Sequence, residues 1–183
     1  MNSSLHLIIG PMFSGKTSKL IEIAKNAKNT QKKYIALNFL NDKRYSTNKI
    51  VTHDGLELEC IMVKNLFEAE NLEVFKEAEI ILINEGQFFT DLKNFCLKYL
   101  QDKYNKTIVV CGLNGDFKMR KFGEILDIIP FCETIQHLFT KCMKCKDGTP
   151  ASFTKRIIDN EDKIIIGSNE YYIPVCRNCH KSI

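Results

Sequence analysis

The chain alternates short, mostly apolar runs with longer segments in which apolar residues recur every three or four positions. Residues 5–9 form a run that is apolar except for His6 and ends at Gly10, and helical spacing of apolar residues begins at Lys16. Runs of the first kind are typical of buried strands, and segments of the second kind are typical of helices with one buried face. Further strands are expected at 34–39, 60–63, 80–83 and 107–111, and further helices at 66–78 and 91–104. This order predicts an α/β fold with a mainly parallel sheet flanked by helices.

The C-terminal part follows a different pattern. Residues 112–130 mix Gly, charged residues and Phe without a regular period, and the strand-like runs at 153–158 and 163–166 are separated by Asp, Asn and Gly. Short strands with turn residues between them are typical of a small β structure. We therefore expect an α/β domain at 1–140 and a small β domain at 141–183.

The composition, 44% apolar and 26% charged with 9 Gly and 4 Pro, excludes a disordered or collagen-like chain. The longest apolar runs are strand-sized and the N-terminus has no basic segment before an apolar one, so we expect a cytoplasmic protein without a membrane partner. The net charge of +4 is uneven, because residues 1–50 carry nine basic and two acidic side chains. An anionic ligand is therefore expected at the N-terminal part.

The chain has eight cysteines. In a protein that is not exported, cysteines serve as metal ligands or reduced core residues more often than as disulfides. The four that occur singly are interpreted as buried thiols: Cys60, Cys96, Cys111 and Cys132. The other four form two Cys-x-x-Cys pairs, Cys142 with Cys145 and Cys176 with Cys179.

These two pairs suit one tetrahedral zinc site, because each pair can place two sulfurs on one turn and a hairpin can return the second pair to the first. His180, next to Cys179, is an alternative fourth ligand, and a redox dithiol is the competing interpretation. Two pairs in one short segment favour zinc. With four protein ligands and no open coordination position, the zinc is expected to be structural.

Residues 10–17 read Gly10-Pro11-Met12-Phe13-Ser14-Gly15-Lys16-Thr17 and fit the phosphate-loop pattern G-x-x-x-x-G-K-[ST] between a predicted strand and a predicted helix. Glycines allow backbone N–H groups to turn towards phosphate oxygens, and the helix N-terminus adds positive potential. Lys16 can reach the β and γ phosphates, and the Thr17 hydroxyl can ligate Mg²⁺. The motif predicts a nucleoside triphosphate site in a phosphate-loop NTPase-like fold.

Polar residues follow the buried run 80–83 at once, beginning with Asn84 and Glu85. The carboxyl edge of an open parallel sheet is where such folds bind ligands. Phosphate-loop enzymes normally carry an Asp near Mg²⁺ at the first of these positions, whereas Asn84 offers an amide oxygen without charge. Glu85 has two open roles, activation of water as in an ATPase and acceptance of a proton from a substrate hydroxyl.

Asp42 and Arg44 follow the predicted strand 34–39 after a short turn, so they can face the same phosphates, Asp42 on the metal and Arg44 on phosphate oxygens. Arg44 is one of four arginines, which favours a use of its planar, forked geometry. The polar stretch that follows leads into a predicted hairpin at His53-Asp54-Gly55.

Together these motifs resemble the type II, cellular-type thymidine kinase family over almost the whole chain. Several motifs in the same order are more specific than any one of them. The motifs that carry the resemblance are Gly10-Pro-Met-Phe-Ser-Gly-Lys-Thr17, Asp42-Lys-Arg44-Tyr-Ser, Thr52-His-Asp-Gly55, Asn84-Glu-Gly-Gln-Phe-Phe89, Gly112-Leu-Asn-Gly-Asp-Phe117, Phe122-Gly123, Thr154-Lys-Arg156, and Tyr172 before Val175-Cys-Arg-Asn-Cys179. The resemblance implies an ATP-binding domain and a zinc-binding domain in a homotetramer that transfers the γ-phosphoryl group of ATP to the 5′-hydroxyl of thymidine. Feedback binding of thymidine triphosphate is a further expectation.

Carried over by position, the resemblance implies that Glu85 is the catalytic base. It implies phosphate and metal contacts for Lys16, Thr17, Asp42, Arg44, Asn84 and Gln87. It implies a thymine pocket walled by Met12, Phe88, Leu113, Phe117 and Phe122, with Thr154, Tyr172 and a closing segment made of Lys163, Ile164, Ile165, Ile166 and Gly167. A flat base needs apolar and aromatic walls with a few polar groups, although each Phe by itself would be interpreted as core packing.

Asn84 departs from the family, which has Asp there. Two consequences are open: Asp42 holds the metal with water bridging at Asn84, or the chain is a catalytically weak nucleotide-binding homologue. A third class, a zinc-containing ATPase acting on nucleic acid, is disfavoured because 183 residues leave little room for a second lobe and the charge forms no concentrated basic stripe. No direct nucleic-acid partner is expected.

Overall fold

The computed structural model describes residues 3–40, 48–52, 54–158 and 170–181. Its centre is a six-stranded sheet of strand order β5-β2-β6-β7-β1-β8 in which every neighbouring pair is parallel. The strands are β1 (Ser4–Gly10), β2 (Tyr34–Phe39), β5 (Ile61–Val63), β6 (Ile80–Ile83), β7 (Thr107–Leu113) and β8 (Thr134–His137). The predicted parallel sheet is confirmed.

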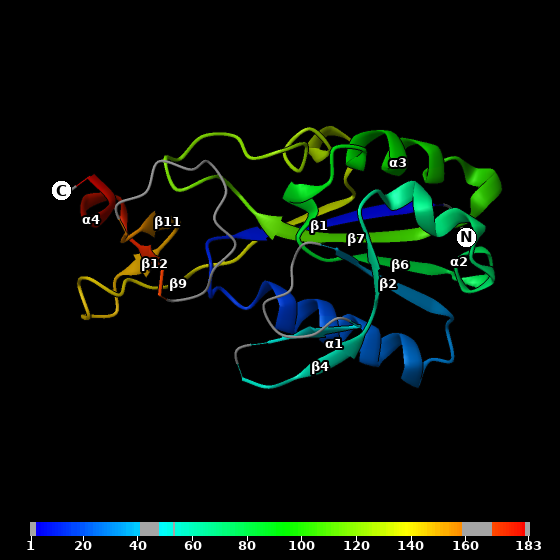
Figure 1. Cartoon of the computed structure of the whole chain (residues 1–183), viewed down its shortest axis with the longest axis horizontal. Coiled ribbons are helices and arrows are strands. Elements are labelled where there is room, and N and C mark those ends of the chain that lie inside the picture. Colours follow the sequence, from blue (N-terminus) through cyan, green and yellow to red (C-terminus); the bar gives the residue numbers. More distant parts are fainter. Residues whose placement is uncertain (1–2, 41–47, 53, 159–169, 182–183) are drawn as a thin grey trace.

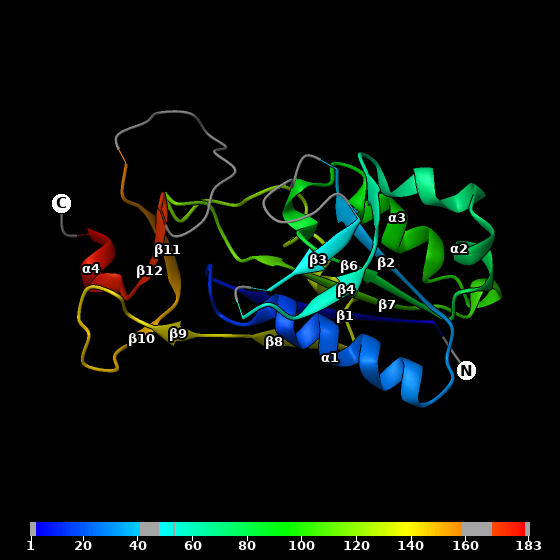
Figure 2. The same ribbon diagram turned by 60° about the horizontal axis from the view of Figure 1, so that its bottom comes forward.

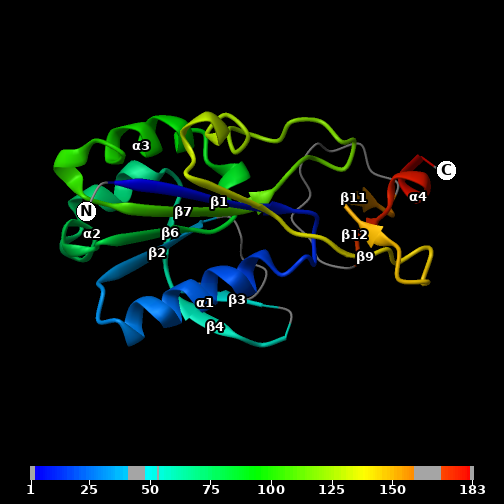
Figure 3. The same cartoon turned by 180° about the vertical axis from the view of Figure 1, so that it is seen from behind.

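Helices cover both faces of the sheet (Figures 1 and 3). α1 (Lys16–Asn29) lies on one face, and α2 (Glu73–Glu77) and α3 (Leu92–Tyr99) lie on the other. Because successive side chains of a strand point to opposite faces, Leu7 packs into the core under α3 while Ile8 packs into the core under α1. Burial on both faces explains why these strands are largely apolar in sequence.

Two predicted helices are broken. The segment 66–78 forms a 3-10 helix, η1 (Leu66–Asn71), and then α2, because Leu72 between them is extended with φ −78° and ψ 133°. The segment 91–104 forms α3 and the 3-10 helix η3 (Asp102–Tyr104). Apolar spacing does not reveal the first break, since the apolar side chains on both sides of it reach the same core.

The sequence pattern does not predict β8. All four residues of this edge strand are exposed, and its sequence, Thr-Ile-Gln-His, contains no apolar run. Its register is set by pairing with β1, from His6 opposite Thr134 to Ile9 opposite His137. β8 leads the chain from the sheet to the C-terminal segments (Figure 2).

The predicted hairpin is confirmed as the antiparallel pair β3 (Lys49–Val51) and β4 (Glu57–Glu59), although His53 of the predicted turn lies outside the described residues. The turn is closed by the Thr52 N–H, which donates to the Leu56 carbonyl at 2.9 Å. Ile50 and Leu58 of the hairpin pack into the core under α1.

The C-terminal module consists of short antiparallel pairs and one short helix, beyond the carboxyl ends of the central strands (Figure 2). It has a core of its own, formed by Cys142, Ala151, Val175 and Cys176. Its elements are β9 (Thr140–Lys141), β10 (Pro150–Ala151), β11 (Phe153–Arg156), β12 (Tyr172–Val175) and α4 (Arg177–Lys181). The predicted strand 163–166 lies outside the described residues. Among the described helices, none is both long enough and apolar enough to cross a membrane.

Candidate active site

The phosphate loop, residues 10–17, joins β1 to α1 at the carboxyl edge of the sheet (Figure 1). Phe13 (φ 61°) and Gly15 (φ 83°) adopt the left-handed conformation, which turns neighbouring N–H groups to one side and creates a concave anion site. Gly10 is required by close packing, because a Cβ there would lie 2.6 Å from both the Leu138 carbonyl oxygen and Ser14 Oγ.

Two polar side chains complete this loop. Lys16 is buried, and its Nζ donates to the Pro11 carbonyl oxygen at 2.6 Å. Ser14 Oγ is buried and finds no hydrogen-bond partner among the described residues. A buried hydroxyl without a partner costs about 1–3 kcal/mol, and a phosphate oxygen would supply that partner. Thr17 lies half-buried in the first turn of α1. Together, the conformation of the loop and these side chains fit the binding of a triphosphate.

The end of β6 carries Asn84, which is 4% exposed and uses both ends of its side-chain amide. Its Nδ2 donates to Asn38 Oδ1 at 3.0 Å, and its Oδ1 accepts from Cys111 Sγ at 3.1 Å. Burial and the nearby Glu85 carboxylate together raise the pKa of Cys111 to about 12, although Lys16 opposes this rise. Cys111 is therefore a thiol donor, close enough to Lys16 and Glu85 for both charges to influence it.

Glu85 follows Asn84 and has the left-handed φ of 54°. It is half-buried, and its Oε2 accepts from Gln87 Nε2 at 2.6 Å. Gln87 also accepts from the Leu113 N–H at 3.0 Å. The structure thus brings Glu85, Gln87 and the end of β7 together. β7 is the neighbour of β1, the strand that leads into the phosphate loop.

Aromatic side chains flank this edge. Phe88 stacks on Phe39 with ring centroids 5.3 Å apart, and it meets Phe122 edge-on at 5.4 Å. These contacts place two of the predicted pocket residues, Phe88 and Phe122, side by side. All three rings are half-buried, so one side of the cluster can face a ligand.

A second aromatic group contains Arg156, which lies in the Thr154-Lys-Arg156 motif but has no predicted role in the site. The Arg156 guanidinium carbon lies 3.7 Å from the Phe117 ring centroid, and its Nη2 donates to the Tyr172 hydroxyl at 2.8 Å. Arg156 and Tyr172 are opposite each other in the β11–β12 register. The scarcity of arginine, four in the chain, is the signal that could have drawn attention to Arg156.

Among the described residues, several hydrogen bonds tie the C-terminal module to this edge. The Met12 N–H donates to Thr154 Oγ1 at 3.0 Å, which joins the phosphate loop to β11. His180 Nε2 donates to the Phe117 carbonyl oxygen at 2.9 Å. Predicted site residues from both halves of the chain are therefore in contact.

Seven predicted site residues lie outside the described residues. They are Asp42, Arg44, Lys163, Ile164, Ile165, Ile166 and Gly167.

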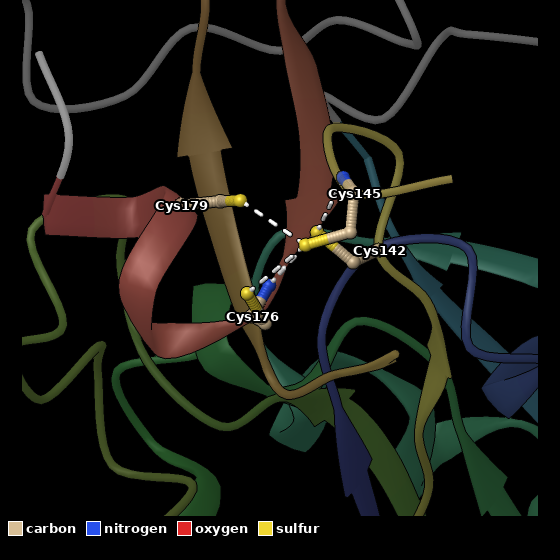
Figure 4. Close-up of side chains that lie close together, drawn as sticks. All are labelled: Cys142, Cys145, Cys176 and Cys179. Atoms are coloured by element: carbon tan, nitrogen blue, oxygen red, sulfur yellow. Dashed lines mark hydrogen bonds between the residues drawn. The ribbon is translucent and has the colours of Figure 1, made fainter. Parts of the chain in front are cut away.

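The four paired cysteines converge in the C-terminal module (Figure 4), where their sulfurs all lie within 4.8 Å of one another. Cys145 Sγ is 3.7 Å from Cys176 Sγ and 3.4 Å from Cys179 Sγ. Tetrahedral zinc with Zn–S bonds of about 2.3 Å holds its sulfurs about 3.8 Å apart, so the cluster fits zinc. The His180 side chain bonds to the Phe117 carbonyl oxygen instead, so Cys179 is the fourth candidate ligand of the metal site.

Backbone N–H groups prepare this cluster for a metal. The Cys176 and Cys145 amides donate to Cys142 Sγ at 3.3 and 3.5 Å. Burial opposes ionisation of Cys142, but these amides outweigh it and lower its pKa to about 6. A thiolate stabilised in this way is the form that binds zinc.

Comparison with known proteins decides the family. A family model described as thymidine kinase matches residues 3–180. The chain belongs to the thymidine kinase family. Thymidine kinase of Oryza sativa subsp. japonica is 38% identical over 177 residues, covering 94% of this chain and 64% of that relative. Thymidine kinase of Monkeypox virus is 38% identical over 176 residues, covering 96% of each chain.

The chain therefore spans less than two thirds of the rice thymidine kinase and almost all of the viral one. Among solved structures, domain III of the Thermotoga maritima replication initiation protein DnaA has a TM-score of 0.45 and 19% identity, covering 73% of this chain and 54% of that chain. Membership of the thymidine kinase family confirms the resemblance that the motifs predict. The alternative of a catalytically weak homologue finds no support in these comparisons.

Proposed function

We propose that the chain is a thymidine kinase that transfers the γ-phosphoryl group of ATP to the 5′-hydroxyl of thymidine and forms thymidine monophosphate. The observation that carries this proposal is the convergence of the phosphate loop, Glu85 and the aromatic groups at one sheet edge, in a chain of the thymidine kinase family. A carboxylate beside a triphosphate loop can serve hydrolysis as well, and family membership favours nucleoside phosphorylation.

In the proposed reaction, the loop N–H groups, Lys16 and the Ser14 hydroxyl bind the phosphates. Glu85 accepts the 5′-hydroxyl proton while the 5′ oxygen forms its bond to the γ phosphorus. The bond between the γ phosphorus and the β–γ bridging oxygen breaks, and ADP leaves. Enclosure by the aromatic groups excludes water, which would otherwise compete with the 5′-hydroxyl.

Mg²⁺ is proposed to accompany ATP. The oxygen donors that would hold it are the Thr17 hydroxyl, the Asn84 amide oxygen and the carboxylate expected from Asp42, the ligand type that Mg²⁺ prefers. Asn84 Oδ1 keeps one lone pair beyond the bond from Cys111. When bound, Mg²⁺ offsets negative charge on the phosphates.

The thymine ring is proposed to lie among Met12, Phe88, Leu113, Phe117 and Phe122, with Thr154, Tyr172 and residues 163–167 closing over the nucleoside. Support comes from the hydrogen bond between Met12 and Thr154 and the contact of Phe88 with Phe122. The apolar rings supply the walls, and Thr154 and Tyr172 supply polar groups.

Purified protein with Mg-ATP and a panel of nucleosides tests the proposal, with monophosphate product as the readout. We expect product from thymidine and little from purine nucleosides. Hydrolysis of ATP that single-stranded DNA stimulates, without any nucleoside monophosphate, would contradict it and favour an ATPase acting on nucleic acid.

The remaining expectations stay proposals. A homotetramer is supported by the edge strand β8 with its exposed Ile135, and by exposed Phe139 shortly after the strand; sedimentation equilibrium tests it. A boundary near residue 140 is supported by the separate core of the C-terminal module. A cysteine cluster arranged as metal ligands is typical of a reducing compartment and supports a cytoplasmic location, which imaging of a tagged chain tests. Competition of thymidine triphosphate with thymidine tests the proposed feedback binding.

A further inference from the structure

Gln87 is a buried amide side chain inside the proposed active site, and it is 2% exposed. Its Nε2 lies 2.6 Å from Glu85 Oε2, and its Oε1 lies 3.0 Å from the Leu113 backbone nitrogen. The side chain therefore spans from the end of β6 to the end of β7 and connects the proposed base to one of the predicted pocket residues.

The orientation of this amide is fixed by its partners. A backbone N–H can only donate, so Leu113 must face the amide oxygen. The amide N–H₂ group then has to face Glu85, where it acts as a donor to a carboxylate oxygen. A hydrogen bond to an ionised group is shorter and stronger than one between neutral groups, in agreement with the 2.6 Å distance.

Two glycines pack closely against Gln87. A Cβ on Gly112 would lie 2.3 Å from Gln87 Oε1, and a Cβ on Gly123 would lie 2.1 Å from the Gln87 carbonyl oxygen. Both glycines thus provide space that Gln87 occupies. Glu85 has the left-handed φ of 54° and leads directly into η2 (Gly86–Phe88), which carries Gln87.

We infer that Gln87 is the positioning residue of Glu85: its amide donates to the carboxylate and aims it at the nucleoside, while its oxygen anchors it to β7. This inference rests on the proposed function. The motif resemblance implies a phosphate contact for Gln87, whereas the geometry directs its amide at Glu85 and Leu113.

Because Gln87 acts through Glu85, its removal should have no further effect once Glu85 has lost its carboxylate. The test is a double-mutant cycle with Gln87→Leu and Glu85→Gln, scored by single-turnover thymidine phosphorylation. In the wild-type background we expect Gln87→Leu to lower the rate roughly 10- to 100-fold, as expected for loss of a hydrogen bond to a charged group. In the Glu85→Gln background the same change should lower it less than about threefold.

A pH profile adds a readout that a merely structural role would not move. Loss of a donor to the carboxylate favours its protonated form, so the acid limb of the rate profile should move to higher pH in Gln87→Leu. Gln87→Glu keeps the shape and the oxygen that faces Leu113, and it should move the acid limb further because two carboxylates then share the site. This second variant also serves if Gln87→Leu folds poorly.

Gln101→Leu is the matched control, because Gln101 is exposed and its carbonyl accepts from Ser3 Oγ near the start of β1, at the opposite edge of the sheet. It should leave the rate and pH profile unchanged. An equal loss from Gln87→Leu in both backgrounds, or an unmoved acid limb, would overturn the inference. Wild-type protein that forms no thymidine monophosphate would instead overturn the proposed function.

Discussion

Replacing Asn84 by Asp gives the chain the carboxylate that the motif resemblance expects at this position. Asn84 donates to Asn38 Oδ1 at 3.0 Å and accepts from Cys111 Sγ at 3.1 Å. An ionised carboxylate cannot donate, so the change removes the bond to Asn38 and places two oxygens against each other. The contact with the Cys111 thiol is retained.

The change therefore costs stability when no metal is bound. A lost hydrogen bond and a buried acceptor left without a partner together cost about 1–3 kcal/mol, and rotation of the Asn38 amide towards the carboxylate gives the low end of that range. For a chain of this size we expect the melting temperature of Asn84→Asp to fall by roughly 2–12 °C.

The same carboxylate should strengthen the hold on Mg²⁺. Two unit charges about 4 Å apart attract by about 1 kcal/mol in water and more at the edge of a protein, so the Mg²⁺ concentration for half-maximal activity should fall at least about fivefold. We expect kcat to rise and the KM for thymidine to change less than about threefold, because position 84 is outside the aromatic groups.

Asn38→Asp is the matched control, because its carboxylate can still accept from Asn84 Nδ2 and adds the same charge to the same buried pair. It should lower the Mg²⁺ requirement less than Asn84→Asp does. The assay is a Mg²⁺ titration of all three proteins at saturating ATP and thymidine, with thermal melts beside it. Identical Mg²⁺ dependence of Asn84→Asp and wild type would refute the reasoning and remove position 84 from the metal site.

Two further substitutions test the C-terminal module. Cys145→Ser should abolish the binding of one zinc per chain, measured by elemental analysis, and lower the melting temperature by roughly 10 °C or more. Cys60→Ser, which lies outside the cluster, is the control and should keep its zinc. Zinc retained in Cys145→Ser would count against the site. Arg156→Lys keeps the charge but loses the planar contact with Phe117, so the KM for thymidine should rise about 5- to 30-fold with the KM for ATP unchanged in steady-state assays. Arg177→Lys is the control, because Arg177 is exposed and its guanidinium also lies over an aromatic ring, that of Phe153. Equal effects of both changes would contradict a role for Arg156 in nucleoside binding.

The sheet and the phosphate loop could be predicted because their signals are local. Five of the six central strands are short, largely apolar runs, and Gly10 to Thr17 carry their chemistry in eight consecutive residues. β8 could not be predicted, because its exposed residues are held by pairing with β1, which no local pattern encodes. The break in the helix at Leu72 could not be predicted for a related reason, because helical spacing of apolar residues continues across it.

Within the candidate site, residue types could be predicted but not their partners. The neutral pair of Asn38 and Asn84 joins positions 46 residues apart. Arg156 meets Phe117 across two segments that have no sequence signal in common. The zinc cluster is the exception, because four cysteines in two pairs leave few other arrangements, and only the turn of His180 towards Phe117 required the structure.

The central claim, phosphorylation of thymidine with Glu85 as the base, is tested most directly by single-turnover transfer of the labelled γ-phosphoryl group of ATP to thymidine by wild-type protein and Glu85→Gln. The wild type should form labelled thymidine monophosphate, and Glu85→Gln should form it roughly 10² to 10⁴ times more slowly while binding thymidine and ATP within about threefold of wild type. Transfer by Glu85→Gln at the wild-type rate would remove Glu85 from the mechanism. Label released by the wild type only as inorganic phosphate, at a rate independent of thymidine, would contradict the proposed function itself.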